Sequence, residues 1–286
     1  MKVLVLGGGQ IAKAVGAAAP AQHEVAIRTH AELNIADEKA LAQTLAQVKA
    51  DWIVNAAAYT AVDLAEDEAA QATAVNDTAV ASLDRAAARE GARLLHLSTD
   101  FVFDGDSRRA YLPGDRTNPL SVYGASKLGG ERHVVAGGEG IVLRTSWVYA
   151  ATGKNFVLTM LRLMREKDQI SVVCDQIGAP TWAASAAAAI WGLIDVKASP
   201  GIYHWTDLGV ASWYDFAVAI QDEALARGLL SRAVPIMPIH SSEYPTRAQR
   251  PAFSVLDSAV TRSLLKVPSR HWRHNLRMML DELRAA

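Results

Sequence analysis

A phenol and an ammonium group stand four residues apart in the segment YGASK, at Tyr123 and Lys127. On a helix, positions i and i+4 lie on one face, one turn apart. A neighbouring ammonium stabilises a phenolate, so Lys127 is expected to lower the pKa of Tyr123 from about 10 and make it a better proton donor and acceptor near neutrality. The pair alone is a weak motif, and its value depends on its surroundings.

A hydroxyl group completes the candidate catalytic set. Thr99 ends the run LLHLST, whose apolar residues are expected to form a strand that precedes the helix of Tyr123. Ligands of open α/β sheets bind at the carboxyl ends of the strands. A hydroxyl at Thr99, a phenol at Tyr123 and an ammonium at Lys127 are the groups needed to polarise and protonate a carbonyl while a hydride arrives.

The glycine-rich segment GGGQIA (7–12) is the second candidate site. It follows the apolar run Val3–Leu6 and precedes an alanine-rich stretch, which is the strand-turn-helix context of a dinucleotide-binding turn. Gly7 permits the tight turn, Gly9 lets the backbone approach a pyrophosphate, and Ala12 keeps the helix close to the strand. We therefore expect a nucleotide cofactor here rather than a plain loop. The apolar run is too short for a signal peptide, whose apolar region has about 7–15 residues.

The second strand bears on which nucleotide binds. An NAD site has an acidic residue roughly 20 positions beyond the glycine turn, but this strand ends Arg28-Thr29-His30 with no acid before Glu32. Arg28 can pair with a 2′-phosphate, which favours NADPH, although a solvated arginine is the alternative. The expected cofactor is NADPH, with NADH left open.

Short apolar runs alternate with alanine-rich stretches in the first half of the chain. Strands are expected at 3–6, 24–28, 52–55, 94–98 and 140–144, and helices at 11–19, 37–49, 72–90 and 123–136. This alternation predicts an α/β fold, a Rossmann-type doubly wound parallel sheet. After residue 150 the alternation loosens and proline-bearing segments separate helices such as 183–194 and 212–227. We expect residues 1–150 to form an NAD(P)-binding domain and residues 151–286 to form mainly a smaller C-terminal substrate-binding lobe, which can interleave with the first domain.

Composition excludes several classes of partner. Lys and Arg (29) nearly balance Asp and Glu (30), so the net charge of −1 gives no electrostatic footprint for nucleic acid or an anionic membrane. No apolar run approaches the roughly 20 residues of a membrane span. The one cysteine, Cys174, rules out an internal disulfide and suits a reducing compartment. We expect a cytoplasmic protein.

Other clusters favour structural roles. The acidic run Asp63 to Glu68 is interpreted as a solvated helix start rather than a metal site. His271 and His274 share a helical face without a third ligand nearby, so no metal is expected. Trp147 differs from the other tryptophans, because it stands where a strand is expected to end and can present its indole to a substrate.

Longer stretches of the sequence resemble a known family. They are ADWIVNAAAYTAVDLAEDE (50–68), AVND (74–77), LLHLSTDFVFDG (94–105), PLSVYGASKLGGE (119–131), LRTSWVYA (143–150), DQIGAPT (175–181), GIYHW (201–205) and YPTRAQRPAFSVLD (244–257). In these stretches the chain is similar to the extended short-chain dehydrogenase/reductase superfamily and, within it, to the dTDP-4-dehydrorhamnose reductase family. The matches run in order over nearly the whole chain.

The resemblance implies an activity and roles for the site residues. NAD(P)H would bind the N-terminal lobe and a dTDP-sugar the C-terminal lobe, and the C4 keto group of dTDP-4-dehydro-β-L-rhamnose would be reduced to give dTDP-L-rhamnose. Tyr123 would supply the proton, Lys127 would hold the nicotinamide ribose, and Thr99 would hydrogen-bond the carbonyl.

The resemblance also implies binding contacts. The implied cofactor contacts are Gly9, Gln10 and Ile11 at the pyrophosphate, Asn34 and Ile35 near the adenosine half, and Ala57, Ala58, Tyr59 and Thr60 along the cofactor. The implied substrate contacts are Thr99, Asp100, Trp147 and Arg250.

Departures from the family pattern leave alternatives open. The glycine turn is one residue shorter than the family's and ends in Ala12, and Asn34 and Phe101 replace a usual Asp and Tyr. Residues 12–19 contain no acid, which argues against a Mg²⁺-held dimer and leaves a monomer or weak homodimer. A non-catalytic regulatory subunit of the same fold is one alternative, which the presence of Thr99, Tyr123 and Lys127 disfavours. Another nucleotide-sugar epimerase or dehydratase is a second, because Asp100 could act as an acid or base there.

Overall fold

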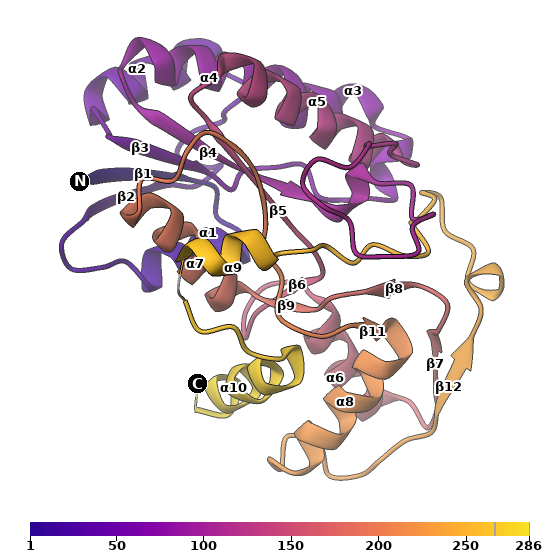
Figure 1. Cartoon of the computed structure of the whole chain (residues 1–286). Coiled ribbons are helices and arrows are strands. Elements are labelled where there is room, and N and C mark those ends of the chain that lie inside the picture. The colour runs from indigo at the N-terminus through magenta and orange to yellow at the C-terminus, as the bar shows by residue number, and fades with distance from the viewer. Residues whose placement is uncertain (266, 286) are drawn as a thin grey trace.

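A six-stranded parallel sheet forms the centre of the computed structural model, which describes residues 1–265 and 267–285 (Figure 1). The strand order is β10-β5-β4-β3-β1-β2. The strands are β1 (Lys2–Leu6), β2 (Glu24–Arg28), β3 (Trp52–Asn55), β4 (Arg93–Thr99), β5 (Ile141–Thr145) and β10 (Gly201–His204). The order reverses direction between β1 and β3, which makes their carboxyl ends the switch point where ligands bind in such sheets.

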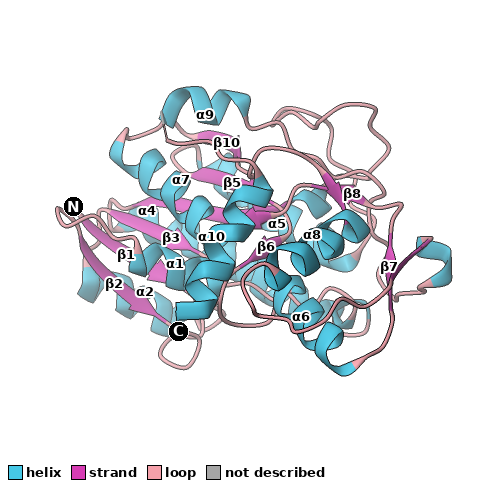
Figure 2. Ribbon diagram, turned by 90° about the horizontal axis from the view of Figure 1, so that it is seen from below, coloured by secondary structure: helices cyan, strands magenta, loops and turns pink. Residues whose placement is uncertain are grey.

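Alternating side chains of the strands enter two separate cores. Val3 and Val5 of β1 pack on one face, beneath α1 (Gln10–Ala17) and α7 (Ala183–Asp195). Leu4 and Leu6 pack on the other face, which is covered by α2 (Glu38–Val48), α4 (Ala79–Arg89) and α5 (Val122–Gly137). A strand buried on both faces is expected of a parallel sheet between helices, and Figure 2 shows this sheet from below. The doubly wound α/β fold predicted from the sequence is confirmed.

Side-chain caps define the starts of several helices. The Asp37 side chain accepts a hydrogen bond from the Ala40 N–H at 3.0 Å, so Asp37 is the N-cap of α2. The expected helix 72–90 begins earlier, because α3 (Ala69–Thr73) runs into a π turn, η2 (Ala74–Thr78), and then into α4. π turns of this kind are frequent at functional sites, and this one carries the buried Asn76.

A second lobe lies below the sheet in Figure 1. Its core joins α6 (Phe156–Glu166), α8 (Trp213–Leu225) and α10 (Trp272–Ala285) around Phe216. Ser212 and Asp215 form a reciprocal capping box that starts α8. The remaining elements are η1 (Leu64–Glu66), η3 (Asp100–Val102), β6 (Val148–Tyr149), β7 (Ile170–Val173), β8 (Ile177–Gly178), β9 (Thr181–Trp182), β11 (Ala211–Ser212), β12 (Ile236–Ile239), η4 (Ser241–Glu243) and α9 (Ala259–Leu265).

The second half of the chain also returns to the sheet. Strand β10 pairs in parallel with β5, with Gly201 opposite Ile141. Helix α7 packs on α1, and the indole N–H of Trp191 donates to the Val15 carbonyl at 3.0 Å. The two halves therefore share one core rather than meeting only at a linker.

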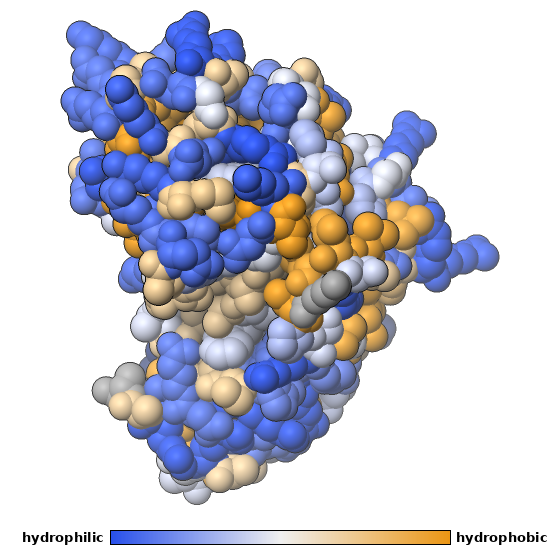
Figure 3. Space-filling view, turned by 60° about the vertical axis from the view of Figure 1, so that its left-hand side comes forward, coloured by the Kyte–Doolittle hydropathy of each residue, from blue (hydrophilic) through white to orange (hydrophobic). Residues whose placement is uncertain are grey.

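The surface carries mixed polarity. The face in Figure 3 is mostly hydrophilic, and hydrophobic side chains gather in one area of it. Among the exposed apolar side chains of the described residues, Val260 of α9 is the most accessible, at 67%. Within the part of the chain that the structure describes, no helix combines the length and the apolar character needed to cross a bilayer.

One fully buried ion pair joins α5 to the sheet. Arg144 of β5 donates to both carboxylate oxygens of Glu131, at 2.8 and 2.6 Å, and both side chains are only 2% exposed. Arg144 also donates to the Pro113 carbonyl and contacts His204 Nε2. Bidentate geometry and these further partners offset the large desolvation cost of two buried charges.

We predict that Glu131→Gln lowers the free energy of unfolding by about 3–5 kcal/mol, because it leaves the Arg144 guanidinium buried without a counter-charge. Urea unfolding followed by circular dichroism measures the change. The matched control is Glu166→Gln, which removes the exposed Arg162–Glu166 pair and is expected to change stability by less than about 0.5 kcal/mol. Equal effects of the two substitutions would contradict this account of the pair.

Candidate active site

Thr99 lies at the carboxyl end of β4, between β3 and β5 near the middle of the sheet. Its hydroxyl donates to Asp100 Oδ1 at 3.1 Å and accepts from the Phe101 N–H at 3.2 Å, which caps η3. The side chain is 7% exposed. The strand end therefore presents one oriented hydroxyl at the edge of the sheet where ligands bind.

Tyr123 lies in the first turn of α5, directly beside Thr99. The Ser121 hydroxyl accepts from the Gly124 N–H and caps this helix. The Tyr123 phenol lies near the Thr99 hydroxyl, and its ring meets Phe101 edge-on at 5.6 Å between centroids. Burial raises the pKa of Tyr123 to about 12; the nearby Thr99 hydroxyl opposes this shift, and the charge of Asp100 adds to it. The phenol is therefore protonated at neutral pH.

Lys127 is almost fully buried, one helical turn beyond Tyr123. Its Nζ donates to the Leu97 carbonyl at 2.6 Å and lies 3.2 Å from His96 Nε2. Burial lowers the pKa of Lys127 to about 8, and Glu131 opposes the shift. The expectation that Lys127 lowers the pKa of Tyr123 is wrong for this structure. Nζ of Lys127 contacts β4 instead, and burial of the phenol is the dominant effect on Tyr123.

The Asp100 carboxyl is, like the Tyr123 phenol, a buried acidic group with a raised pKa at this edge of the sheet. It is 2% exposed, and burial raises its pKa to about 6, with the nearby Ser254 and the hydrogen bond from Thr99 opposing the rise. The structure thus brings Thr99, Asp100 and Tyr123 together as the sequence suggested, with Lys127 behind them.

The glycine turn has the geometry of an anion cradle. Gly7 adopts φ +120°, and a Cβ there would lie 2.9 Å from the Ala56 backbone, so only glycine fits. Helix α1 begins at Gln10 with Gly9 as N-cap, no side chain caps it, and its first turn carries no acid. Free N–H groups at a helix start suit a pyrophosphate. The residues present therefore fit the phosphates of a dinucleotide, although the turn is one residue short.

A cavity of about 200 Å³ opens beside this turn, at the carboxyl ends of β1 and β3. Of the residues expected at the cofactor, seven line it: Gly7, Gly9, Asn34, Ile35, Ala57, Ala58 and Thr60. Five more were not anticipated: Gly8, His30, Leu33, Ala56 and Val75. Most of these adjoin the expected residues in sequence. The rule that ligands bind at the carboxyl ends of parallel strands could therefore have found them. Val75 comes from the π turn and had no such signal.

Four expected cofactor residues do not line this cavity: Gln10, Ile11, Arg28 and Tyr59. The Gln10 side chain contacts Asn155 and the Lys154 carbonyl, across to the second lobe. The Arg28 guanidinium donates to the carbonyl of Ile27 at 2.9 Å. Ile11 packs against the core beneath α1. Their roles toward a cofactor stay predictions.

Asn76 is a site residue that the sequence reasoning did not assign. From the π turn, its amide accepts from the Tyr59 N–H at 2.9 Å and donates to the Tyr59 carbonyl and to Ser126 Oγ, both at 3.0 Å. The Tyr59 hydroxyl donates to Glu68 at 2.8 Å. Asn76 therefore fixes the loop after β3 against the helix that carries Tyr123 and Lys127.

Trp147 occupies the loop after β5 with φ +48°, which is unusual for a bulky residue. Its indole stacks on Trp213 at 3.5 Å between centroids, with 3° between the planes. Gly178 also lies against the indole, close to its Nε1, Cε2 and Cζ2 atoms. These contacts hold the ring at the boundary between the sheet and the second lobe.

Arg250 reaches across to the loop before η1. It donates to both carboxylate oxygens of Asp63, at 3.1 and 2.8 Å, and this bond is the main cause of a lowered pKa of Asp63. Arg247 pairs with Asp67 in the same way. The acids stand at the starts of η1 and α3, and Asp63 and Asp67 remain about half exposed, as expected of a solvated helix start. Their carboxylates also hold the loop of Arg250.

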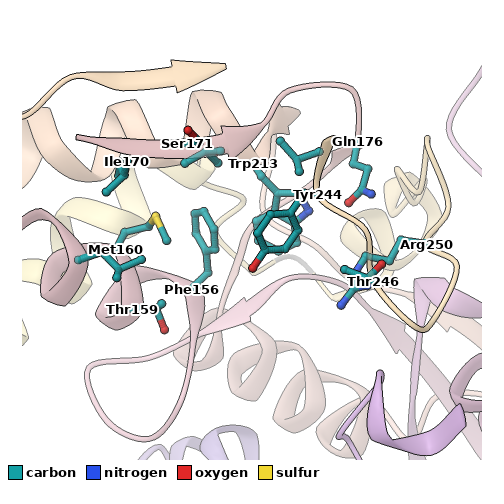
Figure 4. Close-up of a pocket in the computed structure, with 13 residues that line it drawn as sticks. Phe156, Thr159, Met160, Ile170, Ser171, Gln176, Trp213, Tyr244, Thr246 and Arg250 are labelled. Atoms are coloured by element: carbon teal, nitrogen blue, oxygen red, sulfur yellow. The ribbon is translucent and has the colours of Figure 1, made fainter. Parts of the chain in front are cut away.

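A cavity of about 440 Å³ lies in the second lobe, beside Trp213 (Figure 4). Phe156 and Met160 come from α6, and Tyr244, Thr246 and Arg250 come from the loop after η4. Thr99 and Tyr123 do not line it. The stack of Trp213 on Trp147 connects this cavity to the loop that follows β5.

Comparison with known proteins shows similarity to one family over nearly the whole chain. The sequence matches the family described as RmlD substrate binding domain over residues 1–285. It is 40% identical to the dTDP-4-dehydrorhamnose reductase of Burkholderia thailandensis, and the alignment covers 99% of each chain.

Solved structures agree with the fold. A dTDP-4-dehydrorhamnose reductase from Clostridium acetobutylicum matches with a TM-score of 0.93 at 34% identity, over 99% of this chain and 100% of that one. The dTDP-4-dehydrorhamnose reductase of Bacillus anthracis, solved in complex with NADP, also reaches 0.93, at 32% identity and over 98% and 99% of the two chains. The similarity covers both lobes.

We predict a pH-dependent effect of Asp100→Asn on stability. The carboxyl has a higher pKa in the folded protein, about 6, than in an unfolded chain, about 3.9. The contribution of this carboxyl group to the free energy of unfolding is fully present below about pH 4 and is lost as the pH rises through 6. The neutral amide avoids this loss, so its stability relative to the wild type should rise by about 3 kcal/mol between pH 4 and pH 8.

Urea unfolding at the two pH values measures the effect. Asp104→Asn is the matched control, because hydrogen bonds from Asp106 and Tyr111 lower the pKa of Asp104. The stability of this variant relative to the wild type should therefore fall, not rise, between pH 4 and pH 8. An Asp100→Asn variant whose relative stability is the same at both pH values would contradict the assignment.

Proposed function

The chain belongs to the RmlD substrate binding domain family, and we propose that it reduces the C4 keto group of dTDP-4-dehydro-L-rhamnose to give dTDP-L-rhamnose with NADPH. The observation that carries this proposal is the approach of the Tyr123 phenol to the Thr99 hydroxyl at the carboxyl end of β4. Several relatives that match nearly the whole chain carry this activity in their names, and one of them was solved with NADP.

The catalytic groups suit a reduction. Thr99 donates its hydroxyl to the substrate carbonyl oxygen and keeps that oxygen beside Tyr123. Tyr123 gives its proton to the same oxygen, and the raised pKa keeps that proton on the phenol until it is needed. Lys127 in its ammonium form is proposed to hold the nicotinamide ribose. These three groups also favour an enzyme over a regulatory subunit of the same fold.

The cofactor site is proposed at the turn of β1. Gly7 and Gly9 leave room for the pyrophosphate at the start of α1, with Gln10 and Ile11 following. The cavity beside the turn is also lined by Asn34, Ile35, Ala57, Ala58 and Thr60, and Tyr59 is proposed as a further cofactor contact. Bound NADPH supplies the hydride. Arg28 at the end of β2 is the proposed partner of the 2′-phosphate, which lies on the adenosine side.

The substrate is proposed to lie between the two lobes. Asp100 and Trp147 border the sugar, and Arg250 is the proposed cation for the diphosphate. In this structure Arg250 is held by Asp63, so an anionic substrate would share or displace that carboxylate. The cavity beside Trp213 offers aromatic faces that suit a nucleobase.

The organisation of the chain is also proposed. Residues 1–150 form the cofactor domain, and residues 151–286 form mainly the substrate lobe, which returns β10 and α7 to the sheet. The lack of an acid in the first turn of α1 supports a monomer or weak homodimer without a bridging metal. The proposed location is the cytoplasm.

We predict that the purified protein oxidises NADPH only when dTDP-4-dehydro-L-rhamnose is added, which absorbance at 340 nm measures. NADH run in parallel tests the choice of cofactor, and faster turnover with NADPH is the expected result. No absorbance change, under conditions where a known reductase of this family turns over, would overturn the proposal and favour a non-catalytic role.

We predict that Tyr123→Phe lowers kcat about 10²–10⁴-fold, which is the usual rate enhancement from a positioned proton donor. The Kd of this variant for NADPH should stay within a few-fold of the wild-type value. Tyr203→Phe is the matched control, because Tyr203 lies on β10 and its hydroxyl donates to the Ser199 carbonyl. This control substitution should leave kcat unchanged. Near-normal turnover of Tyr123→Phe would refute its role as the proton donor.

A further inference from the structure

Three polar side chains form a buried row beneath the active site. Asn55 of β3 lies opposite His96 of β4 in the strand register. Both are fully buried, and Lys127 of α5 is 3% exposed. Polar groups buried this deeply are normally fully hydrogen-bonded, so the direction of each bond in the row can be worked out.

The backbone orients the amide of Asn55. Its Oδ1 accepts from the Ala57 N–H at 3.2 Å, which leaves Nδ2 to donate to His96 Nδ1 at 3.0 Å. Burial, aided by the charge of Lys127, holds the pKa of His96 well below its usual value. A neutral imidazole has one N–H and one acceptor nitrogen. Because Nδ1 accepts, the proton of His96 is on Nε2.

The next contact in the row depends on that proton. His96 Nε2 lies 3.2 Å from Nζ of Lys127. An N–H group cannot accept a hydrogen bond from an ammonium, but it can donate to the lone pair of a neutral amine. The second partner of Lys127, the Leu97 carbonyl, accepts from either form. The contact with His96 therefore suits only the neutral lysine.

We propose that His96, oriented by Asn55, is a positioning residue that holds Lys127 as a neutral amine against β4 and releases it when the lysine takes up a proton. The ammonium form has no acceptor at His96 and keeps only the Leu97 carbonyl. It is then free to swing toward the cleft beside Tyr123.

The other charged groups around α5 do not replace His96 in this role. Neighbouring elements direct Glu66 (η1), Asp77 (η2), Asp84 (α4), Asp100 (η3) and Arg144 (β5) toward the helix. Glu66 and Asp84 meet the helix at Val122 and Gly137, and Asp77 meets it at Gly129 and His133. On α5 itself, Glu131 favours the ammonium form and opposes burial, which lowers the pKa of Lys127 to about 8. The balance between the two forms of Lys127 therefore falls near physiological pH.

The consequence for turnover rests on the proposed function. If Lys127 acts as an ammonium, activity should fall as the pH rises through the pKa of Lys127, because His96 then captures the neutral amine. His96 would set the position of this alkaline limb without touching substrate or cofactor.

The first test is the tautomer of His96 in the wild-type protein, read from ¹⁵N imidazole shifts between about pH 6 and 9. We expect the Nε2–H tautomer. His204 is an internal reference with the opposite arrangement, because its Nδ1 lies 3.0 Å from the Tyr111 carbonyl and its Nε2 lies 3.3 Å from the Arg144 guanidinium. It should show the Nδ1–H tautomer. An Nδ1–H tautomer at His96 would overturn the proposal.

The second test is the pKa of Lys127, read from the ¹³C shift of its Cε. In His96→Gln the amide can turn its oxygen toward Nζ, so the ammonium gains an acceptor that the wild type lacks. The pKa should rise by roughly one pH unit, the size of one net hydrogen bond. An unchanged or lower pKa would overturn the proposal.

Neither measurement uses substrate. Both can therefore be interpreted even if the protein does not carry out the proposed reduction. If His96→Gln does not fold, the wild-type tautomer still decides. In the active enzyme the alkaline limb of kcat/KM should move upward by the same roughly one pH unit; an unmoved limb together with the expected pKa shift would overturn the link between His96 and turnover.

Discussion

The close approach of α5 to the elements beneath it is the constraint on which the site depends. A Cβ at Gly124 would overlap the carbonyl oxygen of Phe101, and one at Gly130 would overlap that of Asn76. Because these positions carry no side chain, the helix lies directly on η3 and the π turn. Its first turn then brings Tyr123 to Thr99, and its second brings Lys127 to β4. A helix held farther out would separate these groups.

That approach also buries charge, and the surrounding residues compensate for it. Glu131 meets Arg144, and Nζ of Lys127 meets the Leu97 carbonyl. A charge without a partner in such a place would cost several kcal/mol. The same burial moves the pKa of Tyr123 and Lys127 in opposite directions, to about 12 and about 8. Packing of one helix therefore sets the proton states on which a carbonyl reduction would draw.

Much of this arrangement could be predicted from local sequence. The strands at 24–28 and 52–55 end where expected, and the turn at Gly7 has the conformation that its motif requires. What escaped prediction depends on contacts distant in sequence. Examples are the pairing of Arg250 with Asp63, the hold of Asn76 on Tyr59, and the contact of Lys127 with His96. A spacing of four residues shows that two side chains share a helix face, but not which strand residue meets them.

The central claim is that this chain delivers a hydride to a sugar carbonyl at the edge of the sheet near Thr99 and Tyr123. Isotope tracing with NADPH deuterated on the transferred position of nicotinamide C4 tests it most directly. Mass spectrometry and NMR of the product should find a single deuterium, bound to C4 of the dTDP-rhamnose formed from dTDP-4-dehydro-L-rhamnose. Product without deuterium, or with deuterium at another carbon, would contradict the account.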